Sequence, residues 1–529
     1  MKTTNARPQT TIEDNWQERA LRAEALLEET KKEIAYLKAQ VRLLTAKRFG
    51  ASRERTPENT SQLTLFADAF NEAEASAEPF SPEPDLTQVK GYQRKRRKGQ
   101  RDELLQGLPE NVIEYRLSEE EMVCPSCGHA RHIMGQEVHR ELRIVPAQFW
   151  VDVHVQYVYS CRHCEQHSDS HESCVVTAPR PKRAIPNSVA SPSVVAYIME
   201  QKFVMGSPLY RQEQEWERRG IHLTRQTMSN WLLYCAEHWL DPIYQRMKAH
   251  LLKRDIIQAD ETTLKVLNEA GKAAESKSYM WLYRSGREGP GIVLYEYQPD
   301  RRGCRPQEFL RGFQGFLQTD GYAGYNQVEN VIRVGCWSHA RREFDEAIKA
   351  SGTKGRHSKA REGMEFCNKL FRLEREWQDL SPADRYEQRL IHSQPVLEDF
   401  LAWLHATRED VLEKSHLGQA ITYCLNQWEP LTAFLRDGRL EIDNNRSERS
   451  IKPFVIARKN FLFCITPKGA QASAVIFSII ETAKENGLKP FEYLEWLLSQ
   501  LPNATSNDLD QYLPWSDALP DHCRSPKTR

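Results

Sequence analysis

The sequence lacks several features that would assign it to a particular class of protein. No run approaches the ~18 consecutive apolar residues that a membrane-spanning helix needs. Residues 1–16 are too polar to contain the apolar core of a signal peptide. No GxxxxGK[S/T] segment occurs, which argues against an ATP-driven mechanism. We therefore expect a cytoplasmic protein without a membrane partner.

The chain also has no excess charge of either sign. Its 529 residues include 73 Lys and Arg and 73 Asp and Glu, so the formal net charge is zero. DNA-binding domains usually carry a basic excess, so this balance excludes DNA binding through bulk charge. The charges are nevertheless unevenly distributed, with an acidic stretch at 68–86 and a basic one at 87–101. Any contact with nucleic acid must then come from local sites.

The cysteines are too unevenly spread for a secreted disulfide framework, because five of the twelve fall in one short stretch. Within it, Cys124-x2-Cys127 and Cys161-x2-Cys164 form two pairs, and each pair can supply two thiolates from one tight turn. We expect these four thiolates to hold one structural Zn²⁺ in a zinc ribbon at 104–178. Four thiolates leave no open coordination position, so no catalysis is expected there. The residues that could replace one ligand are His129, His132, His163 and Cys174.

The N-terminal part of the chain predicts a disordered tail at 1–17 and a long helix at 18–50. Along this helix, apolar and small residues recur every seven positions, which is typical of a coiled coil. Such a coiled coil would join copies of the chain into a homo-oligomer. A single amphipathic helix that packs on its own protein is the alternative. The two seams are Ala20, Leu27, Ile34 and Val41, and Ala23, Thr30, Leu37 and Leu44.

Residues 51–103 are expected to form a disordered linker, because the first part is rich in Glu, Ala, Ser and Pro. Its last part, 87–101, is a basic arm with seven basic and no acidic residues. Such an arm suits DNA, since each neutralised phosphate releases counterions. The candidate contacts are Arg94, Arg96 and Arg97. A solvated linker or a localisation signal is the alternative.

Residues 185–250 predict a helix-turn-helix domain. A first helix begins at Ser191-Pro192, a second ends at Gly220, and Thr224 caps a third after a short turn. The buried face of the third helix is expected to consist of Met228, Trp231, Leu232 and Cys235. The polar residues near its start are the candidate DNA contacts: Arg225, Gln226, Ser229 and Asn230. Three-helix units of this kind also occur purely as packing modules, which is the alternative.

From residue 251 onward the pattern changes from helices to strands. The expected strands lie at 255–260, 279–284, 292–297, 315–320 and 331–336, with helices at 306–313 and 339–349. Three meandering strands, a helix, and further strands separated by helices form the order of a ribonuclease-H-like fold. We therefore expect a multidomain α+β protein with a ribonuclease-H-like α/β core at 251–349 and 439–500. An all-α insertion at 350–438 interrupts this core, and a C-terminal tail follows at 501–529.

In that strand order, Asp260 and Asp320 fall on neighbouring strands at the centre of the sheet. Two facing carboxylates repel each other unless cations neutralise them. A pair of Mg²⁺ ions (or Mn²⁺) does so, and two such ions ~4 Å apart are what phosphoryl transfer requires. The alternative for each aspartate is an ordinary turn acid at the end of a strand.

A third acid is expected on a later helix that packs against these strands. Asn445 would cap this helix and place Glu448 in its first turn; a plain capping box is the alternative role for this pair. Glu441 and Glu481 are the alternatives to Glu448 as the third acid. Nearby basic residues would suit phosphates close to the site, with surface solvation as the alternative: Lys452, Arg458 and Lys459.

Several long motifs resemble the insertion-sequence-66 family of bacterial DDE transposases. In the core these are QADETTLKVL, LQTDGYAGYN, GCWSHARREFDEA and EIDNNRSERSIKPFVIARKNFLF. Elsewhere they are KRFGASRER, CPSCG, SPLYRQEQEWERRGIHLTRQTMSNW and ETAKENGLKPFEYL, so that the resemblance covers most of 20–500. It implies DNA strand transfer at element ends, using Mg²⁺ held by two Asp and one Glu. These roles fall on Asp260, Asp320 and Glu448.

The pair Cys336-x2-His339 also resembles a Cys/His signature of related transposases, and a packed, hydrogen-bonded pair is the alternative. The resulting hypothesis is a transposase that binds the terminal repeats of double-stranded DNA through its zinc ribbon and helix-turn-helix. The resemblance further suggests accessory transposition proteins as partners. Two other hypotheses remain, namely a non-catalytic DNA-binding regulator and a ribonuclease-H-like nuclease that acts on branched DNA.

Overall fold

The computed structural model describes parts of 20–38 together with 148–160, 175–351, 358–504 and 508–526. The chain divides into two compact units, of which the smaller is Asp68–Arg180 and the larger contains Pro181–Arg529. No helix in the described part of the chain combines the length and the apolar character needed to cross a membrane.

In the smaller unit the described residues form an antiparallel two-stranded ribbon. Strand β1 (Val158–Ser160) pairs with β2 (Val175–Thr177), with Val158 opposite Thr177. This ribbon lies inside the segment expected to be a zinc ribbon. The predicted zinc ligands and the basic arm lie outside the described residues: Cys124, Cys127, Cys161, Cys164, Arg94, Arg96 and Arg97.

The described residues between 20 and 38 are helical, as the heptad pattern predicts. Leu27, Ile34 and Leu37, which belong to the two predicted seams, are exposed in the single chain. The remainder of 18–50 lies outside the described residues, so the coiled coil stays a prediction.

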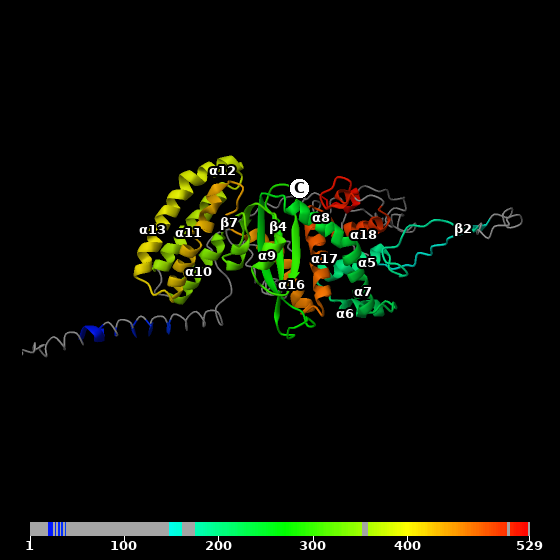
Figure 1. Cartoon of the computed structure of the whole chain (residues 1–529), viewed down its shortest axis with the longest axis horizontal. Helices are drawn as coiled ribbons and strands as arrows, with labels where there is room; N and C mark the ends of the chain where they lie inside the picture. The colour runs from blue at the N-terminus through cyan, green and yellow to red at the C-terminus, as the bar shows by residue number, and fades with distance from the viewer. Residues whose placement is uncertain are drawn as a thin grey trace, which may run out of the picture. The chain divides into compact units, whose positions relative to one another are not determined.

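A five-stranded mixed sheet with the order β5-β4-β3-β6-β7 forms the centre of the larger unit (Figure 1). The strands are β3 (Ile256–Lys265), β4 (Lys277–Ser285), β5 (Val293–Gln298), β6 (Gly315–Gln318) and β7 (Val331–Val334). The first three form an antiparallel meander, whereas β6 runs parallel to β3 and β7 runs parallel to β6. The five strands expected from the sequence are therefore present, and β3 and β6 are neighbours as predicted.

A close backbone approach fixes the start of β6 against β3. The amide of Phe316 donates to the carbonyl of Asp255 at 2.8 Å, directly beside Gly315. Gly315 has a φ of 149°, and a Cβ there would lie 2.3 Å from the same carbonyl oxygen. Only glycine therefore fits at this position.

Helices cover both faces of the sheet, which explains why β4 is buried along most of its length. On one face Tyr283 stacks on Phe309 of α9 (Cys304–Phe309), with ring centroids 3.8 Å apart. On the other face lies α16 (Asn445–Phe461), to which the Arg284 side chain donates hydrogen bonds.

Helix α17 (Pro467–Glu485) protects the edge strand β5. The hydroxyl of Ser478 accepts from the amide of Tyr295 at 2.7 Å, and that of Thr482 accepts from the amide of Val293 at 3.0 Å. These bonds satisfy donors that an edge strand would otherwise leave open to pairing with another chain.

The three helices predicted before the sheet are α5 (Pro192–Phe203), α6 (Leu209–Arg218) and α7 (Arg225–Cys235). Ser191 and Thr224 cap α5 and α7 as predicted, and the expected buried face of α7 is buried. Helix α5 packs on α18 (Pro490–Gln500), and α7 contacts α17. The three helices therefore belong to the same compact unit as the sheet.

Residues beyond α18 also pack on this unit. Tyr512, Leu513 and Cys523 are buried, and Asp510 accepts from Arg246 of α8 (Asp241–Leu251). The C-terminal segment therefore covers part of the core.

The segment between α10 (Trp337–Ser351) and the return to the sheet is helical, as predicted for the insertion (Figure 1). Its helices are α11 (Lys359–Glu376), α12 (Pro382–Gln388), α13 (Gln394–Glu409), α14 (His416–Asn426) and α15 (Trp428–Thr432). Its core, built around Phe344 and Phe400, continues into Trp337 at the start of α10. The buried Arg389 pairs with Glu374 at 2.7 Å and donates to the carbonyl of Leu440. These bonds fix α11 relative to the segment that leads into α16.

Candidate active site

Asp260 and Asp320 lie at the same level of the sheet because β3 and β6 are adjacent and parallel. Gln258 is the register partner of Gln318, and each aspartate follows two residues later. Asp260 lies within β3, which continues to Lys265, whereas Asp320 lies just beyond the end of β6. The amide of Tyr322 donates to the Asp320 carboxylate at 3.0 Å and orients it.

The acidic side chains in this region act on one another electrostatically. Burial raises the pKa of Asp260 well above its ordinary value, and the charges of Glu261, Asp320 and Glu448 raise it further. Burial also raises the pKa of Glu448, and the charge of Asp320 contributes. Carboxylates from β3, from the end of β6 and from α16 therefore repel one another around one point, which is an environment that cations stabilise.

Glu448 lies in the first turn of α16, as predicted, and is 6% exposed. The start of α16 is held against β3 because the Asn444 side chain donates to the carbonyl of Ala259 at 2.9 Å. The predicted cap is wrong by one position, because α16 begins at Asn445 and Asn444 precedes it without a side-chain cap. The Asn445 side chain instead donates to Asp443 at 2.6 Å, so the capping box, which was the alternative role for Asn445 and Glu448, is not formed.

Paired glutamines hold the segment before α16 on the centre of the sheet. The Gln258 side chain donates to Gln318 at 2.9 Å and to the Glu441 carboxylate at 2.7 Å. The Gln318 side chain donates to the carbonyls of Glu441 and Asp443. Both glutamines are buried, so this network fixes the approach of α16 to the two aspartates.

The two alternatives to Glu448 have other partners. Glu441 pairs with Arg287 at 2.5 Å and with Arg446 at 3.3 Å. Burial acts to raise the pKa of Glu441, but these two arginines lower it to about 2. Glu481 lies on α17 and pairs with Lys484 at 2.9 Å. The charge of Glu448, by contrast, raises the pKa of Asp260.

Cys336 and His339 lie beside Glu448, and the potential ligand atoms of these three residues are within 4.8 Å of one another. The His339 Nδ1 atom is 4.0 Å from the Glu448 carboxylate. This nitrogen is buried and has no hydrogen-bond partner among the described residues. Burial raises the pKa of the Cys336 thiol to about 12. Burial also lowers the pKa of His339, so burial favours the neutral form of both side chains beside Glu448.

Sequence reasoning missed Glu261, the residue after Asp260. Its side chain is 2% exposed, pairs with Arg301 and accepts from the Tyr325 hydroxyl at 2.6 Å. Arg301 also lies 4.0 Å from the Asp320 carboxylate, so it balances part of the negative charge. The acidic pair at 260–261 was a visible signal, but its partners are remote in sequence.

The polar face predicted for DNA contact on α7 is exposed at Gln226 and Asn230, whose side chains share a hydrogen bond of 3.1 Å. Ser229 is half-buried. Arg225 is exposed but bonded to Glu213 of α6 and placed over the Tyr210 ring.

The three basic residues predicted near the site lie on α16, but they face different surroundings. Arg458 donates to Thr262 and Thr263 of β3, so its side chain stabilises the packing of α16 on the sheet. Lys452 is half-buried, and Lys459 is exposed.

Comparison with known proteins matches most of Pro181–Arg529, which belongs to the larger unit, to one family. Residues 187–472 match the family described as "Transposase IS66 family", and 478–515 match "IS66 C-terminal element". Residues 121–165, which contain both predicted cysteine pairs, match "zinc-finger binding domain of transposase IS66". Residues 36–113 match "Transposase C of IS166 homeodomain".

Similar curated proteins are found in Sinorhizobium fredii. The protein printed as "Uncharacterized protein y4jD" is 30% identical over 502 residues, covering 92% of this chain and 93% of the relative. "Uncharacterized protein y4hP" is 29% identical over 508 residues, covering 91% of this chain and 88% of the relative. The similarity therefore extends over both units of the chain.

Proposed function

Because the chain belongs to the IS66 family of transposases, we propose that it cuts and joins DNA strands at the carboxylates of Asp260, Asp320 and Glu448. The observation that carries this proposal is the parallel register of β3 and β6, which brings both aspartates to one level beside α16. The charges of Asp320 and Glu448 raise the pKa of Asp260, and the charge of Asp320 raises that of Glu448, which supports it.

We further propose that the sheet and its helices form a ribonuclease-H-like core. The strand order, with an antiparallel meander followed by two parallel strands, supports this assignment. So does the helical insertion between β7 and α16, which leaves the sheet intact.

The donor set suits Mg²⁺ or Mn²⁺, because it consists of carboxylate oxygens from partly buried acids that repel one another. Asp260, Asp320 and Glu448 would hold these ions. When bound, such ions make the attacking oxygen more nucleophilic and stabilise the negative charge on the leaving oxygen in phosphoryl transfer. The protein contributes rigid positions: the Tyr322 amide orients Asp320, and Asn444 holds α16 against β3.

The reaction that we propose has two steps on phosphodiester bonds. Water attacks a phosphorus at the element end, the P–O3′ bond breaks, and a free 3′-hydroxyl results. The oxygen of that hydroxyl then attacks a target phosphorus in line and bonds to it, while the target P–O3′ bond breaks and its oxygen leaves as a new 3′-hydroxyl. No protein side chain attacks phosphorus, so no covalent bond forms between protein and DNA. Arg301, paired with Glu261 beside Asp320, places a positive charge next to the phosphates.

Recognition of the terminal repeats would come from parts outside the sheet. We propose that Cys124, Cys127, Cys161 and Cys164 hold a structural Zn²⁺, which the zinc-finger match supports. The exposed polar start of α7 and the arm at 87–101 would contact DNA. The helix at 18–50 would join copies of the chain, and accessory transposition proteins would assist.

The experiment uses labelled terminal-repeat DNA with Mg²⁺ and compares the wild type with Asp260→Asn and Asp320→Asn. We expect both variants to bind the ends with wild-type affinity and to produce no 3′-hydroxyl ends. Cleavage by Asp260→Asn at the wild-type rate would refute the assignment. End binding by the wild type without any cleavage would favour the regulator, and cleavage indifferent to the repeat sequence would favour the branched-DNA nuclease.

A further inference from the structure

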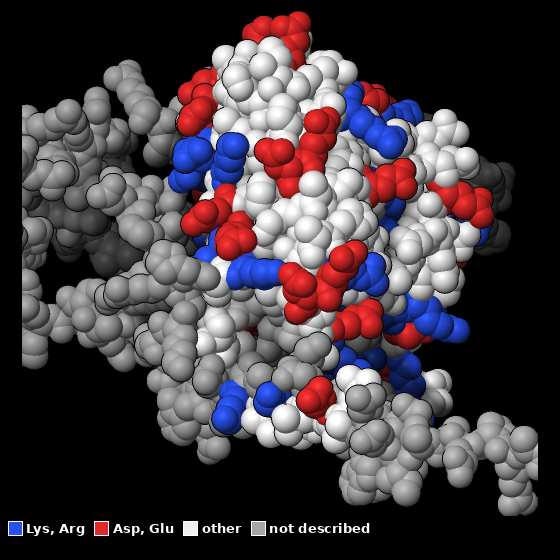
Figure 2. Space-filling view, turned by 90° about the vertical axis from the view of Figure 1, so that its left-hand side faces the viewer, with Lys and Arg blue, Asp and Glu red and all other residues white. Residues whose placement is uncertain are grey.

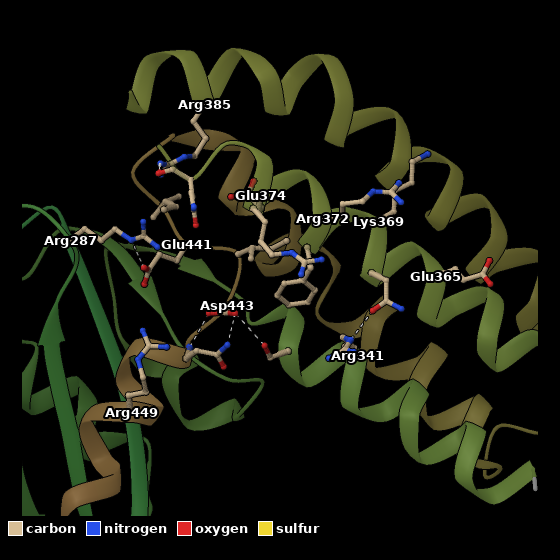
Figure 3. Close-up of a pocket in the computed structure, with 18 residues that line it drawn as sticks. Arg287, Arg341, Glu365, Lys369, Arg372, Glu374, Arg385, Glu441, Asp443 and Arg449 are labelled. Atoms are coloured by element: carbon tan, nitrogen blue, oxygen red, sulfur yellow. Dashed lines mark hydrogen bonds and ion pairs between the residues drawn. The ribbon is translucent and has the colours of Figure 1, made fainter. Parts of the chain in front are cut away.

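A cleft of about 730 Å³ lies between α11 and the segment that leads from Leu440 into α16 (Figure 3). Its large apolar lining residues are Phe371, Leu440 and Ile442, and most of the others are charged or polar. Pockets for small organic ligands are lined mainly by apolar side chains. This cleft is therefore suited to a charged, strongly polar ligand.

The lining is positively charged, since seven of its residues are Lys or Arg and four are Asp or Glu. Three of the acids are already bonded within the fold. Glu374 pairs with Arg389, and Glu441 with two arginines. Asp443 accepts hydrogen bonds from Asn445 and from Ser338 (Figure 3). Of the four acids that line the cleft, only Glu365 of α11 is exposed.

A row of basic residues on α11 lines one wall of the cleft. Lys369, Arg372 and Arg375 follow one another at intervals of three, so they lie along one side of the helix. All three are exposed, and their side chains make no hydrogen bond or ion pair with any residue that the structure describes. Arg449, which is also exposed, lines the opposite wall from α16. Exposed positive charges from α11 and α16 therefore line opposite walls of the cleft.

The cleft opens next to the carboxylates of the candidate active site. Arg449 directly follows Glu448 in α16. Burial raises the pKa of Asp443, and the charge of Arg449 opposes that rise. Ser338, which lines the cleft, precedes His339 beside Glu448. A chain of phosphates that passes Glu448 would therefore continue between Arg449 and the row on α11.

The face of the insertion that Figure 2 shows has a different distribution of charge. Figure 2 views the larger unit from the side of the helical insertion, where acidic and basic side chains lie interspersed. On the side that Figure 2 shows, no continuous basic patch comparable to the row on α11 is visible.

We propose that this basic cleft, lined by Lys369, Arg372, Arg375 and Arg449, binds the sugar–phosphate backbone of the DNA strand next to the phosphodiester that reacts. The inference rests on the proposed function for the identity of the ligand, and it gives the helical insertion a role in substrate binding. The bound strand belongs either to the element end or to the target, since both present the same phosphates.

The test is a charge-removing triple variant of the full chain, with Lys369→Gln, Arg372→Gln and Arg375→Gln. Gln is a good helix former, so these exposed positions tolerate it. Each phosphate contact contributes about 0.9 to the slope of log affinity against log salt concentration. We therefore expect the slope for DNA binding to fall by about 2 to 3. A control triple removes exposed charges of the insertion outside the cleft: Arg361→Gln, Arg408→Gln and Lys414→Gln.

Two DNAs distinguish the sources of the strand. A reduced slope with labelled terminal-repeat DNA assigns the cleft to the element end. A reduced slope with an unrelated duplex, together with normal end cleavage and impaired strand transfer, assigns it to the target. A slope equal to that of the control triple on both DNAs, with wild-type cleavage, would overturn the cleft proposal and leave the proposed function intact. Failure of the proposed function would give a different result, namely cleavage by Asp260→Asn at the wild-type rate.

Discussion

Replacement of Asn444 should distinguish a residue that positions Glu448 for catalysis from one that only stabilises the fold. It is 1% exposed, and its side chain donates to the carbonyl of Ala259, the residue before Asp260. In Asn444→Ala this bond is lost while the backbone of α16 remains. Removing one partner of a buried hydrogen bond costs about 1–3 kcal/mol of stability.

The effect on cleavage should exceed the effect on stability. Without the bond to Ala259, the start of α16 can move relative to β3, and Glu448 moves with it. A displacement of about 1 Å at a reacting centre can cost about 100-fold in rate. We expect the single-turnover rate of terminal-repeat cleavage by Asn444→Ala to fall about 10- to 100-fold, with unchanged DNA affinity.

Asn486→Ala is the matched control. The Asn486 side chain donates to the carbonyls of Gly291 and Thr482 at 2.7 and 2.8 Å, so it joins the end of α17 to the loop that precedes β5. It lies at the end of α17, on a different helix from Glu448. Because Asn486 is half-buried, we expect a shift of the urea midpoint no larger than that of Asn444→Ala, and a normal cleavage rate. Equal cleavage rates for the two variants would refute the positioning role of Asn444.

Three further predictions concern other parts of the chain. Gly315→Ala should destabilise the protein by about 1–3 kcal/mol in urea unfolding, because the new Cβ would lie 2.3 Å from the Asp255 carbonyl. Gly312→Ala should cost less, because the alanine would be strained by the φ of 87° but would meet no atom within 4 Å. The pKa of Glu441 is lowered from 4.5 to about 2, so its pairing stabilises the protein above pH 4.5 and is lost as the pH falls toward 2. Glu441→Gln should not show this pH-dependent loss of stability. Identical acid unfolding curves for the wild type and Glu441→Gln would contradict the prediction. Cys124→Ser should lower the zinc content measured by elemental analysis and weaken terminal-repeat binding, and a full zinc content would count against the four-thiolate site.

The sequence was informative where local pattern and chain order decide the structure. Asp260 and Asp320 could be placed on neighbouring strands because the order of strands and helices limits the sheet to few topologies. The caps Ser191 and Thr224 were predictable because an N-cap bonds only to the next turn of its own helix.

Prediction from the sequence failed where contacts between residues that are distant along the chain determine the structure. Asn445 was expected to cap α16, but the bond from Asn444 to Ala259 sets the start of that helix, and no local pattern encodes it. Glu261 was missed because its partners, Arg301 and Tyr325, are distant along the chain.

The cleft could not be derived from the sequence at all. The basic row on α11 has the spacing of an ordinary solvated helix face, and only the packing of the insertion turns it toward α16. Buried Arg389 sets that packing, through bonds to Glu374 and to the carbonyl of Leu440.

The most direct test of the account is the rate of Mg²⁺-dependent strand transfer by Glu448→Gln, measured beside Glu441→Gln and Glu481→Gln on the same terminal-repeat DNA. We predict that only Glu448→Gln loses strand-transfer products while it still binds the ends. Glu448 and the two aspartates affect one another electrostatically, whereas Glu441 and Glu481 are paired with basic residues. Normal strand transfer by Glu448→Gln, with loss in either of the other two variants, would contradict the assignment of the active site.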